Sequence, residues 1–204
     1  MNENRPIVVL AEPMYHSAGE TLLGTCASVR RLVSPTVAEV RAACADAHAL
    51  APRYPQRVDA ELLDSAPHLV IVACSGRGTD AVDVEAATER GIAVVNNPGF
   101  GRWPVSETAI AMILALAKRL IVSDQWMRRG EGWLHRTDFS EILELHGKTL
   151  GVVGFGVVGS ETARKAIAAF GMRVIAYDPY VPAALMREVG AEAACTLDAL
   201  LDEA

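Results

Sequence analysis

The chain contains the glycine-rich stretch GFGVVG at residues 154–159. An apolar run typical of a strand, residues 149–153, precedes it, and a stretch with helical spacing, residues 160–170, follows it, a context that raises the pattern above chance. In such a turn the first glycine permits a tight bend, the second lets the backbone approach a pyrophosphate, and the third lets the helix pack closely on its strand. N–H groups at the start of the helix then bind phosphate groups. We therefore predict a dinucleotide site that contains Gly154, Phe155, Gly156, Val157, Val158 and Gly159.

An acidic residue, Asp178, follows the next predicted strand, residues 173–177. A carboxylate at this point accepts hydrogen bonds from the adenosine ribose hydroxyls and repels a 2′-phosphate. Residues 178–181 contain no arginine that would reverse this preference. The pattern therefore predicts NAD rather than NADP as the cofactor. A glycine-rich turn without a ligand is the alternative, and the strand, turn, helix, strand and aspartate in the right order disfavour it.

Strands and helices alternate along the chain. The predicted strands are residues 7–11, 69–73, 92–95, 149–153 and 173–177, and the predicted helices are 37–45, one that starts at 59, 84–90, 104–120, 160–170, a weaker one near 182–189, and 197–201. A loop connects the first strand to the first helix. Residues 124–146 lose the helical period, which predicts an extended arm or an irregular segment. Parallel strands need helix-sized connections, so the alternation predicts an α/β protein with parallel sheets.

Composition excludes several classes of protein. Hydrophobic residues make up 51% of the 204 residues, enough for one or two buried cores, and no apolar run reaches the length of a membrane span. The net charge of −6, with no block of like charges, does not indicate a nucleic-acid or membrane surface. The four cysteines form no C-x-x-C pair and predict reduced thiols, not disulfides or a metal site. The expected location is the cytoplasm.

Several further motifs occur in order around the glycine turn. They are VIVACSGRGTDAVD at residues 70–83, AATERGIAVVNNPG at 86–99, VSET at 105–108, and the stretch from Trp133 to Gly159 that contains ELHGKTLGVVGFGVVG. Together they resemble the D-isomer-specific 2-hydroxyacid dehydrogenases, the family that includes D-3-phosphoglycerate dehydrogenase and hydroxypyruvate reductase. The resemblance covers the N-terminal portion of that family. Two departures are the loop Phe100–Trp103, which lacks a frequent asparagine, and Thr108, which replaces a frequent histidine.

The resemblance implies a division into two doubly wound parallel-sheet domains. Residues 1–100 would form a flavodoxin-like substrate-binding domain without its C-terminal return, and residues 101–204 an incomplete Rossmann NAD-binding domain. The substrate, a small 2-hydroxy or 2-oxo acid, would place its carboxylate at the backbone N–H groups of Ser75, Gly76, Arg77 and Gly78. The Arg77 side chain either contacts the cofactor or substrate or points to water. Pro179 and Tyr180 would join the cofactor site, with Tyr180 beside the adenine.

The resemblance also implies a homodimer through the helix and arm of residues 104–147, which would explain Trp126 and Trp133. A position in an internal core is the alternative for these two tryptophans. The substrate of the reaction is not readable from the loops.

The family's arginine, carboxylate and histidine catalytic residues are expected beyond Ala204, and no catalytic or metal-binding residue is assigned here. None of the five histidines (His16, His48, His68, His135 and His146) has a neighbouring carboxylate pattern that indicates acid–base chemistry. We expect an NAD-dependent hydride transfer between nicotinamide and C2 of a D-2-hydroxy acid, in a span that is inactive alone. A catalytically inactive NAD-binding module or subunit partner is the alternative, and an inert fragment with an exposed sheet edge is a weaker one.

Overall fold

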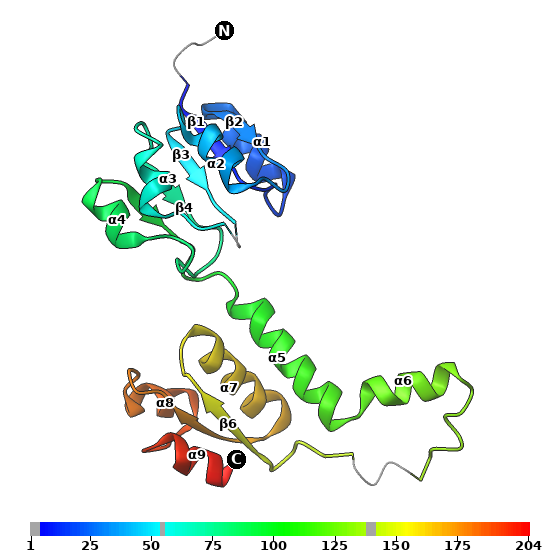
Figure 1. The fold of residues 1–204 in the computed structure, drawn as a ribbon. Helices are drawn as coiled ribbons and strands as arrows, with labels where there is room; N and C mark the ends of the chain where they lie inside the picture. Colours follow the sequence, from blue (N-terminus) through cyan, green and yellow to red (C-terminus); the bar gives the residue numbers. More distant parts are fainter. Residues whose placement is uncertain (1–4, 54–55, 138–141) are drawn as a thin grey trace. The chain divides into compact units, whose positions relative to one another are not determined.

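The computed structural model describes residues 5–53, 56–137 and 142–204. The chain folds into two compact units, Met1–Phe100 and Gly101–Ala204. Both units consist of parallel strands connected by helices (Figure 1), so the predicted α/β class is confirmed. The part of the predicted arm at residues 138–141 lies outside the described residues.

The first unit is a five-stranded parallel sheet in the order β2-β1-β3-β4-β5, which is the flavodoxin-like order. Its elements, in chain order, are β1 (Ile7–Leu10), α1 (Ser17–Cys26), β2 (Ser28–Arg31), α2 (Val37–Cys44), β3 (Ala49–Ala51), α3 (Ala60–Asp64), β4 (Ile71–Ala73), α4 (Val84–Glu89) and β5 (Ala93–Val95).

One face of this sheet carries the core of the first unit. Val9, Leu50 and Val72 are in register on neighbouring strands and are fully buried. Apolar side chains of α2, α3 and α4 pack against this row, because these helices bury the apolar stripe that their spacing predicts. The opposite face of the sheet, with Val8 and Ala49, is only half-buried. The two faces of the sheet therefore differ in how completely helices cover them.

Residues 12–36 do not form the simple loop that the sequence predicts. They contain α1 and the edge strand β2, and the short strand β3 was also missed. None of the α1 residues is buried, and β2 has the sequence SVRR, so neither element shows an apolar pattern. Pairing with β1 specifies β2 instead, through backbone hydrogen bonds that no side-chain pattern reveals.

The second unit has a three-stranded parallel sheet in the order β6-β7-β8. Its elements are α5 (Arg102–Ala117), α6 (Leu120–Arg128), β6 (Thr149–Val153), α7 (Val157–Phe170), β7 (Arg173–Tyr177), α8 (Ala183–Val189), β8 (Glu192–Ala193) and α9 (Leu197–Glu203). The helix α5 packs against α7, and α9 packs against β6 and β7. A Cβ on Gly151 would lie 2.9 Å from Leu200 Cδ2, so this glycine lets α9 approach the sheet.

The long helix and the arm differ from the prediction. The predicted single helix, residues 104–120, begins at Arg102 and ends at Ala117, and Arg119 then adopts a left-handed φ of 50°. The helix α6 follows, so the first part of the expected arm is helical. The strand β8 was not predicted, because two residues carry no period. Pro104 lies in the first turn of α5, where its missing N–H costs nothing.

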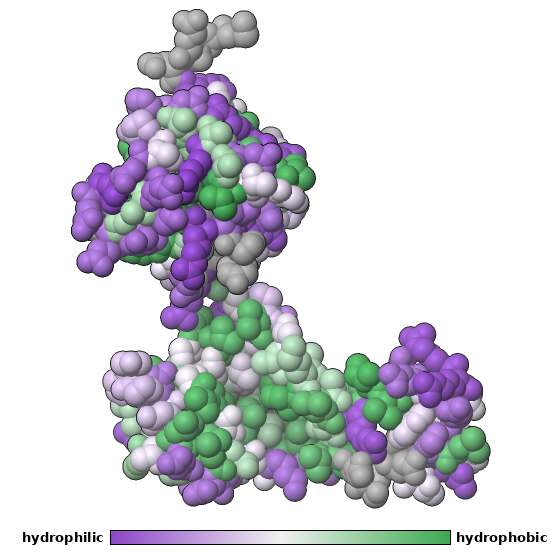
Figure 2. All heavy atoms as spheres, in the orientation of Figure 1, coloured by the Kyte–Doolittle hydropathy of each residue, from purple (hydrophilic) through white to green (hydrophobic). Residues whose placement is uncertain are grey.

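The surface of α5 and α6 is unusually apolar. Figure 2 shows hydrophobic side chains gathered over α5 in the second unit. We define the α5–α6 apolar surface by its exposed members, which are Val105, Met112, Leu116, Leu120, Ile121 and Met127. Ile110, Ile113 and Leu114 pack inward against the core, so α5 is apolar on two sides. No helix within the described residues is long and apolar enough to cross a membrane.

Candidate functional site

The glycine turn connects β6 to α7, and its geometry requires glycine at two positions. Gly154 has φ of +88°, a left-handed conformation that favours glycine, and its N–H donates to Tyr177 O at 2.8 Å. A Cβ on Gly159 would lie 2.0 Å from the Gly154 carbonyl oxygen, which is a severe clash. The first and third glycines therefore have the tight-turn and close-packing roles that the motif predicts.

The start of α7 presents free backbone donors. Gly156 is the N-cap residue in an extended conformation, and no side chain caps the helix. Within the described part of the chain, the N–H groups of Gly156, Val157, Val158 and Gly159 donate to no protein acceptor. Uncapped N–H groups at a helix N-terminus, with the positive end of the helix dipole, are suited to bind an anion such as a pyrophosphate.

Asp178 follows β7 and connects it to the turn. Its Oδ1 accepts from Tyr180 N at 2.8 Å and from Val181 N at 3.2 Å, and its Oδ2 accepts from Phe155 N at 2.7 Å. These donors, Tyr180 N–H first, lower the pKa of the Asp178 carboxyl below its usual value, because they stabilise the ionised form. Each carboxylate oxygen can accept more than one hydrogen bond, so Asp178 retains capacity for a ligand hydroxyl.

The remaining predicted cofactor residues differ in their exposure. The Phe155 side chain is only 4% exposed and belongs to the core of the second unit, so only its backbone can face a ligand. Val157 and Val158 are half-buried, whereas Pro179 is exposed and Tyr180 is 92% exposed. The structure thus brings the turn and Asp178 together and leaves the Tyr180 ring in solvent.

The predicted substrate turn follows β4 in the first unit. Within the described residues, the backbone N–H groups of Ser75, Gly76, Arg77 and Gly78 donate to no protein acceptor. Asn96 Nδ2 donates to Arg77 O at 2.6 Å, and Asn97 N donates to Gly76 O at 2.9 Å. These asparagines follow β5 and orient the turn, because they occupy the carbonyl groups of Gly76 and Arg77 and leave the N–H groups facing away.

Asn96 was missed as a site residue, although the sequence contained a signal for it. The strands β4 and β5 are parallel neighbours, and their carboxyl ends meet at one edge of the sheet. Polar residues directly after two successive predicted strands are therefore expected to lie close together. The Arg77 side chain is exposed.

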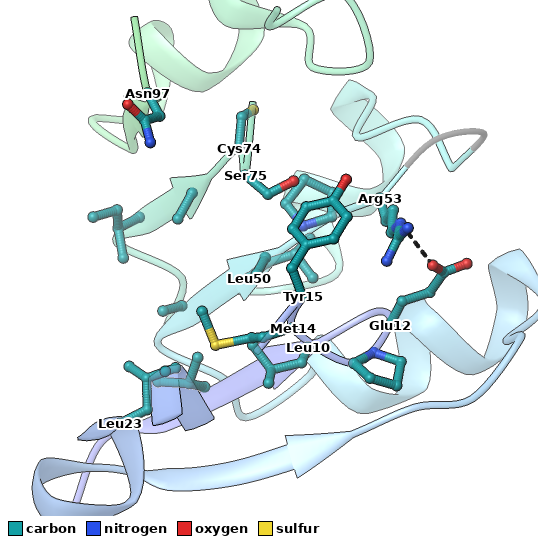
Figure 3. A pocket seen from close by; sticks show the side chains of 18 of the residues that line it. Leu10, Glu12, Met14, Tyr15, Leu23, Leu50, Arg53, Cys74, Ser75 and Asn97 are labelled. Atoms are coloured by element: carbon teal, nitrogen blue, oxygen red, sulfur yellow. Dashed lines mark ion pairs between the residues drawn. The ribbon is translucent and has the colours of Figure 1, made fainter. Parts of the chain in front are cut away.

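A cavity of about 610 Å³ lies beside this turn, within the first unit (Figure 3). Its lining includes Glu12, Tyr15 and Arg53, and a smaller hollow of about 260 Å³ adjoins the turn itself. Arg53 Nε is 2.8 Å from Glu12 Oε2, and the Arg53 guanidinium lies 4.8 Å from the centre of the Tyr15 ring. This group of side chains was not anticipated from the sequence.

Four of the histidines have structural contacts, and two of them, His48 and His68, stack on each other with 6.2 Å between ring centres. His16 Nδ1 accepts from Ala18 N and caps α1, and His48 Nδ1 accepts from Ile7 N. His135 stacks on Trp126 with 4.1 Å between ring centres. Among the described residues, no group of three His, Cys, Asp or Glu side chains is arranged to hold a metal ion.

The fold and the glycine turn define a doubly wound α/β protein with a dinucleotide-type turn in its second unit. More specifically, the chain belongs to the D-isomer-specific 2-hydroxyacid dehydrogenase family, whose catalytic-domain model matches residues 8–201. This match extends through both units, and it makes the chain a member of an oxidoreductase family.

Individual relatives are consistent with this assignment. The chain is 42% identical over 199 residues to a D-3-phosphoglycerate dehydrogenase from Mycobacterium bovis, a match that covers 98% of this chain and 37% of that protein. It superposes with a TM-score of 0.84 and 25% identity on D-mandelate dehydrogenase from Rhodotorula graminis, covering 98% of this chain and 64% of that one. For D-lactate dehydrogenase from Aquifex aeolicus, in complex with NAD and lactic acid, the TM-score is 0.81 at 29% identity. This match covers 97% of this chain and 58% of that one. The chain spans about a third of the length of the curated dehydrogenase it matches.

Proposed function

We propose that this chain provides the substrate-binding and NAD-binding parts of an oxidoreductase acting on a D-2-hydroxy acid. When bound, the nicotinamide supplies or accepts the hydride that is exchanged with C2 of the acid. The observation that carries the proposal is the glycine turn, which leaves N–H groups uncapped at the start of α7 and donates from Phe155 N–H to the carboxylate of Asp178. The D-lactate dehydrogenase that shares this fold contains NAD, which supports the choice of cofactor.

We assign the first unit to the substrate and the second to the dinucleotide. The free N–H groups of the turn at Ser75–Gly78 form a concavity suited to a carboxylate. The N–H groups at the start of α7 would hold the pyrophosphate, and Asp178 would accept from the ribose hydroxyls. In this arrangement the residues of this chain bind and orient the two reactants, and we assign no catalytic residue among them.

Calorimetric titration of the protein with NADH and NADPH tests the cofactor assignment. We expect NADH to bind more tightly than NADPH by on the order of tenfold or more, because two like charges about 4 Å apart near a protein surface repel by roughly 1–4 kcal/mol. The control is the same pair of titrations with Asp202→Asn, which removes an exposed carboxylate on α9. The preference for NADH over NADPH should be unchanged in this variant. Equal affinity for both cofactors, or no binding of either, contradicts the proposal.

A binding module without turnover is the second candidate. It is favoured by one observation, namely that His16 and His48 accept backbone N–H groups through Nδ1 and so have structural roles in the first unit. Oxidation of NADH with glyoxylate or hydroxypyruvate tests the module. Turnover contradicts it, and tight NADH binding without any turnover is the result that it requires.

We further propose that two copies associate through the α5–α6 apolar surface. Exposed apolar patches of this kind are typical of interaction sites, and α5 is already packed on its other side. The exposed Trp133 and Leu134 would extend the same interface.

The four cysteines are all free thiols, which agrees with the reducing cytoplasm that we propose as the location.

A further inference from the structure

The glycine turn contains no cation of its own. Residues 154–160 have the sequence GFGVVGS, so the negative charge of a pyrophosphate would meet only backbone N–H groups and a hydroxyl there. The carboxylate of Asp178, which accepts from Phe155 N at 2.7 Å, adds a further negative charge beside the turn. A positive side chain from another element would therefore strengthen dinucleotide binding, provided that no carboxylate already neutralises it.

Helices α5 and α7 begin at the same end of the second unit (Figure 1). They are joined near this end, where Lys165 Nζ of α7 donates to Ser106 Oγ of α5 at 2.7 Å and to Trp103 O at 3.4 Å. Arg102 is the first residue of α5, and Glu161 lies in the second turn of α7. Arg102 therefore lies at the end of the unit at which α7 presents its uncapped N–H groups.

The two cations of α7 near this end are paired with carboxylates. Arg164 pairs with Glu161, which is only 6% exposed, and Lys165 Nζ lies 3.6 Å from Glu107 Oε1 and 4.0 Å from Glu161 Oε1. The hydrogen bond from Arg164 is the main cause that lowers the pKa of the Glu161 carboxyl, and the charges of Lys165 and Arg102 lower it further. Arg102 is thus close enough to act on Glu161, but Arg164 and Lys165 already neutralise that carboxylate.

The Arg102 guanidinium is the cation that remains available. Within the described residues it forms no ion pair, and its ring contact is with its neighbour Trp103, 5.9 Å from the guanidinium carbon to the ring centre. The Arg102 side chain is exposed, so it can turn toward a ligand without leaving a carboxylate unpaired. The charged residues of this part of α5 and α7 therefore have one positive charge in excess, namely Arg102, Arg164 and Lys165 against Glu107 and Glu161.

We propose that Arg102 is a cofactor-binding residue, whose guanidinium pairs with the pyrophosphate of the dinucleotide and supplies the positive charge that the glycine turn lacks. A guanidinium suits this role because its planar fork donates two parallel hydrogen bonds to a phosphate group. The inference rests on the proposed function, because it needs a dinucleotide at the start of α7. It also gives a role to the loop Phe100–Trp103, where this sequence departs from the family.

Calorimetric titration of the wild-type protein and of Arg102→Gln with NADH and with ADP-ribose tests the inference. We expect the variant to bind both ligands on the order of tenfold more weakly, because both contain the pyrophosphate and a charge-assisted contact is lost. Arg187→Gln removes an exposed arginine of α8 in the same unit and should bind both ligands as the wild type does. Equal affinities of Arg102→Gln and wild type, or an equal loss in Arg187→Gln, overturn the inference alone. A wild-type protein that binds neither ligand overturns the proposed function as well.

Two further readouts separate a charge contact from a structural effect. Arg102→Lys should retain most of the affinity for NADH, because it keeps the positive charge. Added salt should weaken NADH binding more steeply in the wild type than in Arg102→Gln, because salt screens an exposed ion pair. A loss that lysine does not restore, an identical salt dependence, or a loss for NADH that ADP-ribose does not share contradicts the placement of Arg102 at the pyrophosphate.

Discussion

Asp178 shows how one carboxylate acts in two ways within the second unit. It accepts hydrogen bonds from three backbone N–H groups, one of which, Phe155 N–H, belongs to the glycine turn. The same side chain would discriminate between NADH and NADPH. Its contribution to binding is therefore coupled to its contribution to the shape of the turn, and a variant that keeps the size of the side chain is needed to separate the two.

Asp178→Asn removes the charge and keeps the volume. We expect NADH affinity to fall on the order of tenfold and the preference over NADPH to disappear, because hydrogen bonds to charged groups contribute about 1.5–3 kcal/mol. Fluorescence titration of bound NADH measures both effects. Asp198→Asn on α9, whose carboxylate is exposed, is the matched control. A variant that still prefers NADH strongly would assign the discrimination to another residue.

The lowered pKa of the Asp178 carboxyl makes its contribution to the stability of the folded chain depend on pH. A carboxyl group whose pKa is lowered by folding stabilises the native state above its unfolded pKa, near 3.9, and this stabilisation is lost as pH falls through the lowered pKa. The charge of Asp178 should thus persist through mildly acidic pH, where a free aspartate begins to be protonated.

Helix α5 is anchored to α7 by a polar cluster that connects the two elements. Lys165 Nζ donates to Ser106 Oγ at 2.7 Å and lies 3.6 Å from Glu107 Oε1 and 4.0 Å from Glu161 Oε1. Ser106 is fully buried and Glu161 is 6% exposed, and Arg164 also pairs with Glu161. The cluster therefore holds the first turn of α5 against the helix that opens at the glycine turn.

Lys165→Met should destabilise the protein by about 0.5–1.5 kcal/mol, because it removes the hydrogen bond that Lys165 donates to the buried Ser106 Oγ. Urea unfolding followed by circular dichroism measures the change in midpoint. Lys148→Met is the matched control, because Lys148 is exposed and follows the loop before β6. Equal midpoints for the two variants would show that the cluster contributes little to the stability of the second unit.

At the scale of the whole molecule, the α5–α6 apolar surface is the feature that folding of one chain does not account for. Leu116 on α5 is 80% exposed, and Ile121 on α6 is 65% exposed. A solvated helix normally directs polar residues to its outer side. The second copy of the chain that we propose as a partner would cover these residues.

Leu116→Glu should therefore shift the protein from dimer to monomer in sedimentation velocity, because a buried unpaired charge opposes association. Leu201→Glu places the same charge on α9, at another exposed apolar residue, and should leave the dimer intact. A wild-type protein that sediments as a monomer at all concentrations contradicts the proposed interface.

The sequence alone determined the features that depend on local chemistry. The glycine turn, the acid after β7 and the apolar strands β1 and β4 to β7 follow from spacing and side-chain type, because tight turns and buried strands restrict which residues fit. The α/β class followed from the alternation of these elements, and the family from the order of the motifs.

Tertiary structure decided the rest. Strands β2, β3 and β8 are specified by backbone pairing with neighbours far along the chain, which leaves little trace in two to four side chains. The Glu12–Arg53 pair and the cavity beside it bring together the ends of strands β1, β3 and β4, and no local pattern encodes that meeting. Whether a charge is free or neutralised depends on its neighbours in space, so the pairing of Arg53 with Glu12 emerged only from the fold.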